Sequence, residues 1–320
     1  MTGRVATAPP TAISMLAAIA MLVASATGCL PGDERPVPGS VLLNVNRSDA
    51  VAEGFVTDDG WHVSFDRFVT ALGGVPLGRS GRGPGSGEDC VDYSFSTYDR
   101  LYDFTVAGTS KVVLHYGLGR CTIPFSLRQP SPEAILMAGV TAADLELMGP
   151  GDSDMFEKNE ESGVGLLLVG RAEQEGVTKQ FSWHLAANHL INECYAPFSD
   201  EVVNTIDLYG EDAHVRQLEI RPQELFRVTP SLEAAIEFGR FAEADADDDG
   251  TITLAELAEV DVPFDQVLDD LLDELPDDFK DEKGGTIFDE ATLLTLIRDI
   301  LSRRVAAFEG AGECEAGSDF

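Results

Sequence analysis

The chain has 320 residues and carries 56 acidic against 22 basic side chains, a formal net charge of −34 at pH 7. This charge excludes a generic nucleic-acid-binding protein and disfavours attraction to anionic lipid surfaces. Hydrophobic residues make up 44% of the chain, enough for a real core in one large or two moderate domains.

Residues 1–28 have the pattern of an export signal and are not expected to belong to the fold. Arg4 is their only charge, and residues 15–26 form an apolar core too short to span a bilayer. Two cleavage sites compete. Ala24-Ser25-Ala26 fits ordinary signal peptidase, whereas Ala26-Thr27-Gly28-Cys29 resembles a bacterial lipobox in which Ala26 stands where Leu is usual.

The number of cysteines favours the lipobox. If Cys29 is lipidated, four cysteines remain, an even set that can form two disulfides outside the cytoplasm. Residues 29–39 would then be a tether containing Pro and Gly. By resemblance to bacterial lipoproteins, Leu30 implies sorting to the outer membrane, and triacylation of Cys29 would anchor the chain there. We therefore expect an exported, outer-membrane-anchored lipoprotein on the periplasmic or cell-surface face.

Residues 40–228 have the pattern of a β-rich domain. Residues 55–61 look like a hairpin with an Asp-Gly turn, and Trp61, Val63 and Phe65 then alternate with polar residues as in a half-buried strand. Further strands are predicted at 41–45, 111–116, 164–171, 179–185, 202–208 and 215–220, and short helices at 132–136 and 141–148. Antiparallel strands at this spacing predict a β-sandwich, with a barrel as the alternative.

Four cysteines lie beyond the tether and allow three pairings: Cys90, Cys121, Cys194 and Cys314. Cys90 and Cys121 flank strands in one part of the predicted sandwich, whereas Cys194 lies late in it and Cys314 follows the last predicted helix. We hypothesise the pairs Cys90–Cys121 and Cys194–Cys314, the second of which would clamp a helical domain onto the β domain. The alternative is that some of these cysteines are buried and reduced.

Other motifs in this region carry little chemistry. Residues 73–80 imitate a P-loop with Arg79 in place of Lys, but no amphipathic helix follows, so a phosphate site is not expected. The sequence contains no HExxH or GxSxG motif. A histidine metal site would require His62, His115 and either His184 or His189 to converge.

The C-terminal region contains the run Asp245-Ala-Asp-Asp-Asp-Gly-Thr-Ile-Thr-Leu-Ala-Glu256. Gly250 permits a sharp turn at its centre, because a residue without Cβ tolerates positive φ. Five residues can offer oxygen ligands to one cation. Carboxylates come from Asp245, Asp247 and Asp249 at positions 1, 3 and 5. Thr251 adds a backbone carbonyl at position 7, and Glu256 adds a closing carboxylate at position 12. This spacing resembles the calcium loop of the EF-hand family, and the resemblance implies bound Ca²⁺.

EF-hands normally occur in pairs, and the flanking sequence suggests a partner. Thr229 and Pro230 predict the start of a helix leading to the loop, and a short helix is expected after it, to about Val260. Residues 280–291 resemble a second loop with its ligands lost, between helices predicted at 264–275 and 293–308. We interpret residues 229–308 as an EF-hand pair in which the degenerate loop supplies β pairing, and 309–320 as a tail.

These features predict an α+β multidomain protein, with a β-sandwich-like antiparallel domain followed by an all-α paired EF-hand domain. The expected function is that of a non-enzymatic, calcium-binding, membrane-anchored lipoprotein. Calcium would stabilise the EF-hand module beside a β-sandwich that contacts an unknown protein or glycan. The alternatives are an exported hydrolase with catalytic groups in the β domain and a histidine-based metal carrier.

Overall fold

The computed structural model describes residues 37–47, 49–78, 90–94, 99–106, 108–149, 163–210, 213–262 and 292–317. Cys29 and the predicted signal segment lie outside the described residues. So do the degenerate loop predicted at 280–291 and the helix predicted at 264–275.

The smaller of two β-sheets takes three strands from each half of the chain. Its strands are β1 (Gly39–Asn46), β4 (Val91–Asp92), β6 (Thr109–Thr122), β12 (Thr205–Leu208), β13 (Ala213–Ile220) and β15 (Ala306–Phe308). They run in the order β12-β6-β1-β13-β15, with β4 beside β6. β1 is antiparallel to β6 but parallel to β13, so this sheet is mixed.

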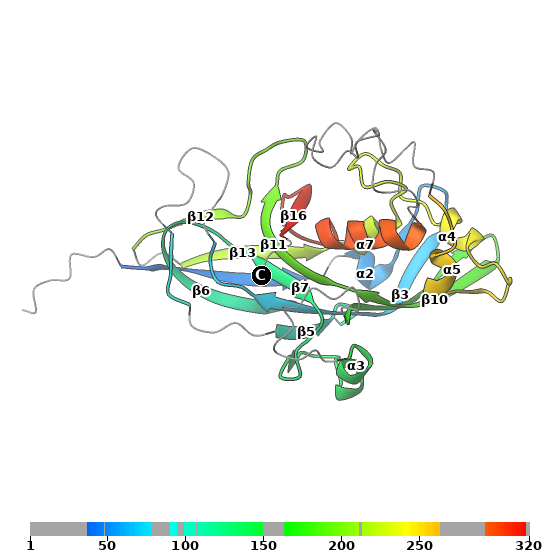
Figure 1. The fold of residues 1–320 in the computed structure, drawn as a ribbon, viewed down its shortest axis with the longest axis horizontal. Coiled ribbons are helices and arrows are strands. Elements are labelled where there is room, and N and C mark those ends of the chain that lie inside the picture. Colours follow the sequence, from blue (N-terminus) through cyan, green and yellow to red (C-terminus); the bar gives the residue numbers. More distant parts are fainter. Residues whose placement is uncertain are drawn as a thin grey trace, which may run out of the picture. The chain divides into compact units, whose positions relative to one another are not determined.

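The larger sheet has ten strands. They are β2 (Phe55–Val56), β3 (His62–Gly74), β5 (Asp99–Asp103), β7 (Phe125–Arg128), β8 (Ile135–Leu136), β9 (Val164–Gln174), β10 (Val177–Ala186), β11 (Asn188–Tyr195), β14 (Thr251–Ile252) and β16 (Glu313–Gly317). Figure 1 labels β3, β5, β7, β10, β11 and β16 among them. The main order is β14-β10-β9-β3-β7-β11-β16. Both of its ends are therefore strands from the C-terminal third of the chain.

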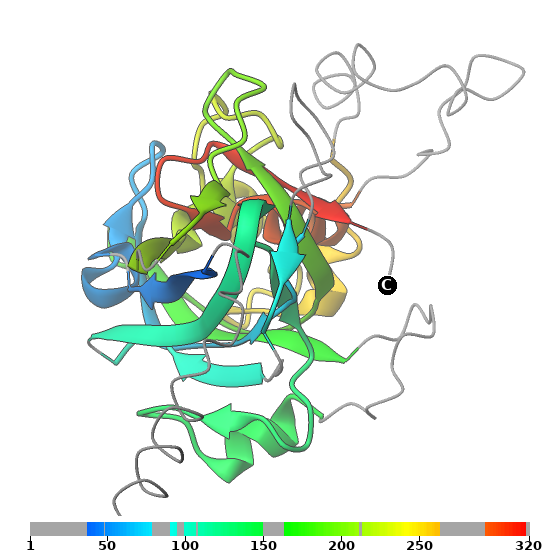
Figure 2. The same ribbon diagram turned by 90° about the vertical axis from the view of Figure 1, so that its left-hand side faces the viewer.

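The predicted division into a β domain and a following all-α EF-hand domain is wrong. Strands hold 48% and helices 16% of the described residues. The α-helices described are short: α2 (Asp49–Glu53), α3 (Ala142–Leu147), α4 (Gly239–Glu243), α5 (Leu254–Leu257) and α7 (Leu293–Arg303). In both views the red C-terminal elements lie among the strands rather than apart from them (Figures 1 and 2). The C-terminal region contributes β14, β15 and β16 to the two sheets instead of folding separately.

The helix predicted from Thr229 is largely replaced by turns. Only Gly239–Glu243 is helical before the acidic loop. Upstream, Arg227 and Ile236 form a β-bridge, and the amide of Val228 donates to the carbonyl of Ala235 at 3.0 Å. The apolar residues that predicted a helix belong instead to a segment that folds back on itself. Ile236, Phe238 and Phe241 pack in or against the core, although Ile236 and Phe238 are not in a helix.

Other local predictions have mixed outcomes. α3 agrees with the predicted helix at 141–148 and begins with a capping box between Thr141 and Asp144. The helix predicted at 132–136 is wrong, because Ile135–Leu136 form β8. α7 confirms the helical repeat after residue 292, but Phe308, expected to continue it, belongs to β15.

One hydrophobic core joins both sheets and α7. Alternate residues of β1 are buried, and they share this core with residues of β3, β9, β10 and β13. α7 contributes Leu296, Ile297 and Ile300 and packs against β15 and β16. The 3-10 helix η1 (Pro222–Phe226) adds Leu225 and Phe226.

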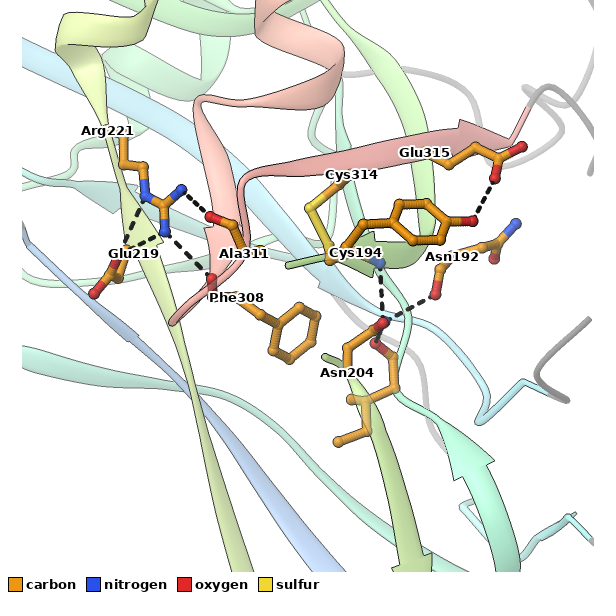
Figure 3. The surroundings of a disulfide bond; sticks show 11 residues. Asn192, Cys194, Asn204, Glu219, Arg221, Phe308, Ala311, Cys314 and Glu315 are labelled. Atoms are coloured by element: carbon orange, nitrogen blue, oxygen red, sulfur yellow. Dashed lines mark hydrogen bonds and ion pairs between the residues drawn. A yellow bond between two sulfur atoms is a disulfide. The ribbon is translucent and has the colours of Figure 1, made fainter. Parts of the chain in front are cut away.

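Both hypothesised disulfides are present. Cys90–Cys121 ties the start of β4 to β6, and Cys194–Cys314 joins β11 to β16 where the two residues are register partners. The second bond staples the last strand to the sheet rather than clamping a helical domain. Figure 3 shows buried Asn204 beside it, accepting from the amide of Cys194 at 3.0 Å.

Two disulfides point to an exported, non-cytoplasmic protein. Among the described residues, none of the helices has the length and apolar character needed to cross a membrane.

Candidate metal centre

The acidic loop, residues 245–256, follows α4, contains β14 and ends within α5. Figure 1 places α4 and α5 beside one end of β10. Asp245, Asp247 and Asp249 each bring one carboxylate oxygen to within 4.8 Å of the others. Calcium binds oxygen at about 2.3–2.6 Å, so two ligands on opposite sides of one ion stand up to about 5 Å apart. The three carboxylates therefore fit a single hard cation of that size.

The loop backbone turns these carboxylates inward. Gly250 has φ of 86° and Asp248 has φ of 56°, both in the left-handed region that Gly and Asp tolerate best. Asp245 accepts from the amides of Asp249 at 3.1 Å and Gly250 at 2.9 Å. Asp249 in turn accepts from the amide of Thr251 at 2.6 Å. These hydrogen bonds hold the loop backbone around the Asp245 carboxylate without a bound cation.

Glu256 lies at the edge of the cluster and not within it. One of its oxygens accepts from the amide and the hydroxyl of Thr253, each at 2.8 Å, which caps α5. Its other oxygen accepts from the amide of Ala246 at 3.2 Å. Glu256 is therefore already directed back toward the start of the loop. Thr251 is exposed and occupies β14.

The loop pairs with the large sheet. β14 is parallel to β10, and Thr251 lies opposite Gln180. The backbone N–H of Gln180 donates to the carbonyl of Gly250 at 2.8 Å. The sequence predicts β pairing with the degenerate loop at 280–291, which lies outside the described residues. The pairing that the structure contains makes the candidate site an extension of a sheet edge.

A cluster of buried aromatic side chains lies next to the acidic loop. Trp183 stacks on Phe181 at a centroid distance of 4.7 Å and on Phe241 of α4 at 5.8 Å. Phe226 and Phe238 complete the cluster, and all five side chains are at most 2% exposed. Close packing of this kind resists displacement, so the aromatic cluster gives the loop a firm base.

The turn between β2 and β3 holds the N-terminus of α4. Asp59 accepts from the amide of Gly239 at 2.7 Å and from that of Phe238 at 3.1 Å, although it lies 180 residues before Gly239. A carboxylate at this position satisfies amides that lack helical partners and complements the helix dipole. Asp59 thereby fixes the short helix that leads into Asp245.

A lysine from β10 neutralises the first carboxylate of the loop. Lys179 Nζ lies 2.5 Å from Asp245 Oδ2 and 3.4 Å from Asp248 Oδ1. The hydrogen bond from Lys179 is the main cause that lowers the pKa of the Asp245 carboxyl, and it likewise raises the pKa of the Lys179 ammonium. This contact could not be predicted from local sequence patterns, because the two residues lie 66 positions apart.

Within the described residues, the histidines are not gathered into a group that could hold a metal ion. In the described part of the chain, the one group of three or more potential metal ligands is Asp245, Asp247 and Asp249. His115 is instead buried on β6, with its Nδ1 3.2 Å from the hydroxyl of Ser94.

A pocket beside the loop is lined by Asp66, Arg171, Gln180 and Thr251 among others. Arg171 lies 3.5 Å from Asp66, and the side chains are 47% and 63% exposed respectively. The Asp66 carboxylate is exposed to solvent, whereas the general acid of a hydrolase is usually a desolvated carboxyl.

Comparison of the chain with protein-family models, curated proteins and solved structures finds no match. Fold and site together define a disulfide-bonded, mostly β protein whose acidic loop can hold a metal ion.

Proposed function

We propose that this protein is a non-enzymatic, calcium-binding lipoprotein exported from the cytoplasm. The observation that carries the proposal is the convergence of Asp245, Asp247 and Asp249 within 4.8 Å, at the first, third and fifth positions of a loop that resembles an EF-hand. Thr251 would add its backbone carbonyl and Glu256 its carboxylate. Oxygen ligands of this kind suit a hard cation.

Calcium acts as a structural element in this proposal. The loop contains β14, which forms the edge of the large sheet beside β10, so an ion that holds the loop closed also holds that edge. Extracellular calcium is plentiful, and extracellular calcium modules of this type bind at roughly 0.1–1 mM. At ten times the Kd, binding would add about 1.4 kcal/mol to the free energy of unfolding.

A calorimetric titration with CaCl₂ tests the site. The wild-type protein is expected to bind one Ca²⁺, and Asp247→Asn to lose most of this binding, because Asp247 is an exposed ligand whose replacement spares the fold. Asp261→Asn, an equal charge change at an exposed position outside the loop, should bind as the wild type does. Equal binding by wild type and Asp247→Asn would reject this site.

We further propose that Cys29 carries the lipid that attaches the protein to the outer membrane. The two disulfides use the four cysteines of the described residues, and Cys29 is the fifth cysteine of the sequence. Expression with a clickable fatty acid should label the wild type but not Cys29→Ser, and the variant should leave the membrane fraction. The membrane-anchored β sheets would then present a surface to a protein or glycan partner.

A further inference from the structure

Lys179 is a cation already present at the proposed calcium site. Its side chain is 11% exposed and that of Asp245 is 0% exposed, so this ion pair is withdrawn from water. Asp245 Oδ2 accepts from Lys179 at 2.5 Å and also from the amide of Gly250 at 2.9 Å. The first carboxylate of the loop is thus neutralised without a metal.

The position of Lys179 is fixed by the sheet. Lys179 directly precedes Gln180, which pairs with Thr251 across the β10–β14 ladder. The backbone pairing therefore sets the point from which the lysine stem reaches Asp245. Asp248, the fourth residue of the loop, provides a second carboxylate for the ammonium at 3.4 Å. Two contacts from a rigid strand distinguish this arrangement from a chance surface pair.

A calcium ion bound by Asp245 would lie within a few ångströms of the ammonium. Like charges at such separations repel, and solvent screens this repulsion only in part, because the Asp245 side chain is buried and Lys179 is half-buried. The ion and the ammonium would also compete for the electron density of one carboxylate. Each therefore weakens the binding of the other, and the coupling is reciprocal.

We propose that Lys179 is a built-in competitor of calcium that sets the affinity of the loop. In the metal-free protein the ammonium neutralises Asp245 and keeps the loop folded against β10. Calcium binding displaces it from Asp245, so part of the binding free energy is spent on breaking the ion pair. This inference rests on the proposed calcium site. The competition would keep the affinity of the loop in a range suited to abundant calcium.

The test compares wild type with Lys179→Met, which keeps the apolar stem and removes the charge. Two quantities are measured: the calcium Kd by calorimetry and the melting temperature in a chelator. We expect Lys179→Met to bind calcium about tenfold more tightly, within the usual range of coupled sites. Its metal-free melting temperature should fall. Lys111→Met, an equal charge loss at an exposed position on β6, should change neither quantity appreciably.

The outcomes separate the two proposals. If neither wild type nor Lys179→Met binds calcium, the calcium site itself is wrong. If the wild type binds calcium and Lys179→Met binds it equally or less tightly, the calcium site stands and the competitor role of Lys179 is overturned.

A second measurement needs no variant, which covers the case of a variant that fails to fold. In the wild-type protein, reductive methylation followed by mass spectrometry should modify Lys179 faster with calcium than with a chelator. An equal or slower rate with calcium would contradict displacement of the ammonium.

Discussion

Trp183 donates a hydrogen bond from its indole Nε1 to the carbonyl oxygen of Ile252 at 2.8 Å, and both residues are fully buried. Trp183 belongs to β10 and to the aromatic cluster, whereas Ile252 is part of the acidic loop. This bond therefore connects the candidate metal centre directly to the core. Loop closure and core packing should depend on each other.

Replacing Trp183 by Phe should destabilise the protein by about 1–3 kcal/mol, because the buried carbonyl of Ile252 loses its donor. Urea unfolding followed by circular dichroism measures this loss. Trp61→Phe is the matched control, since Trp61 packs against Phe238 at 5.3 Å and not on the loop carbonyl. Similar losses in the two variants would mean that side-chain volume, and not the hydrogen bond, is responsible.

Asp59→Ala should cost about 1 kcal/mol of stability, as expected when a helix loses its capping acceptor. Calcium affinity should fall as well, because α4 leads directly into Asp245. Asp59→Asn keeps one oxygen acceptor and should lose less of both. Unfolding and calcium titrations of the two variants provide the measurement. An Asp59→Ala protein with wild-type calcium affinity would show that α4 does not position the loop.

The local parts of this fold were predictable from sequence, whereas the long-range parts, apart from the two disulfide pairings, were not. Alternation of apolar and polar residues identified the start of β3, apolar segments between turn signals identified β1, β9 and β10, and the helical repeat identified α7. Such patterns report which face of an element is buried but carry no information about its partner. For this reason the pairing of β14 with β10 was missed, and the C-terminal third was assigned to a separate helical domain.

The residues of the candidate site also fall into those that the sequence predicts and those that it does not. Asp245, Asp247 and Asp249 were identified because their spacing and the central Gly250 are local. Lys179 and Asp59 were missed, since each reaches the loop region from a distant strand or turn. Their contacts arise only after the sheet has brought β10 and the β2–β3 turn together.

The two disulfides should differ in their contribution to stability. Cys194–Cys314 has a sequence separation of 120 and Cys90–Cys121 one of 31. Loop-closure entropy grows with the length of the closed loop. Removing Cys194–Cys314 should therefore lower the free energy of unfolding by about 1 kcal/mol more than removing Cys90–Cys121. Denaturant unfolding of the paired Cys→Ala variants measures this difference. Non-reducing peptide mapping checks the connectivity, and a Cys121–Cys194 peptide would be incompatible with it.

Stability should fall on mild acidification because of a buried histidine. Burial lowers the pKa of His115 below its ordinary 6.5, and nearby Asp92 only partly opposes this. Below pH 6.5 the unfolded chain takes up a proton more readily than the folded one, so stability present above that pH is lost as the pH falls toward the folded pKa.

Urea unfolding at about pH 7.5 and about pH 5.5 tests this dependence. His115→Gln should show a smaller loss between the two conditions than the wild type. His62→Gln, at an exposed position on β3, is the control for removing a histidine. The same loss in wild type and His115→Gln would show that another group controls the acid limb.

The most direct test of a structural calcium site is the melting temperature with and without millimolar calcium. If calcium closes the loop against β10, the wild-type melting temperature should rise by about 2–5 °C, as expected for a gain near 1.4 kcal/mol. Glu256→Gln should abolish the rise while preserving the cap of α5, because Gln also completes a capping box. A wild-type melting temperature that does not move with calcium, or an equal rise in Glu256→Gln, would contradict the account.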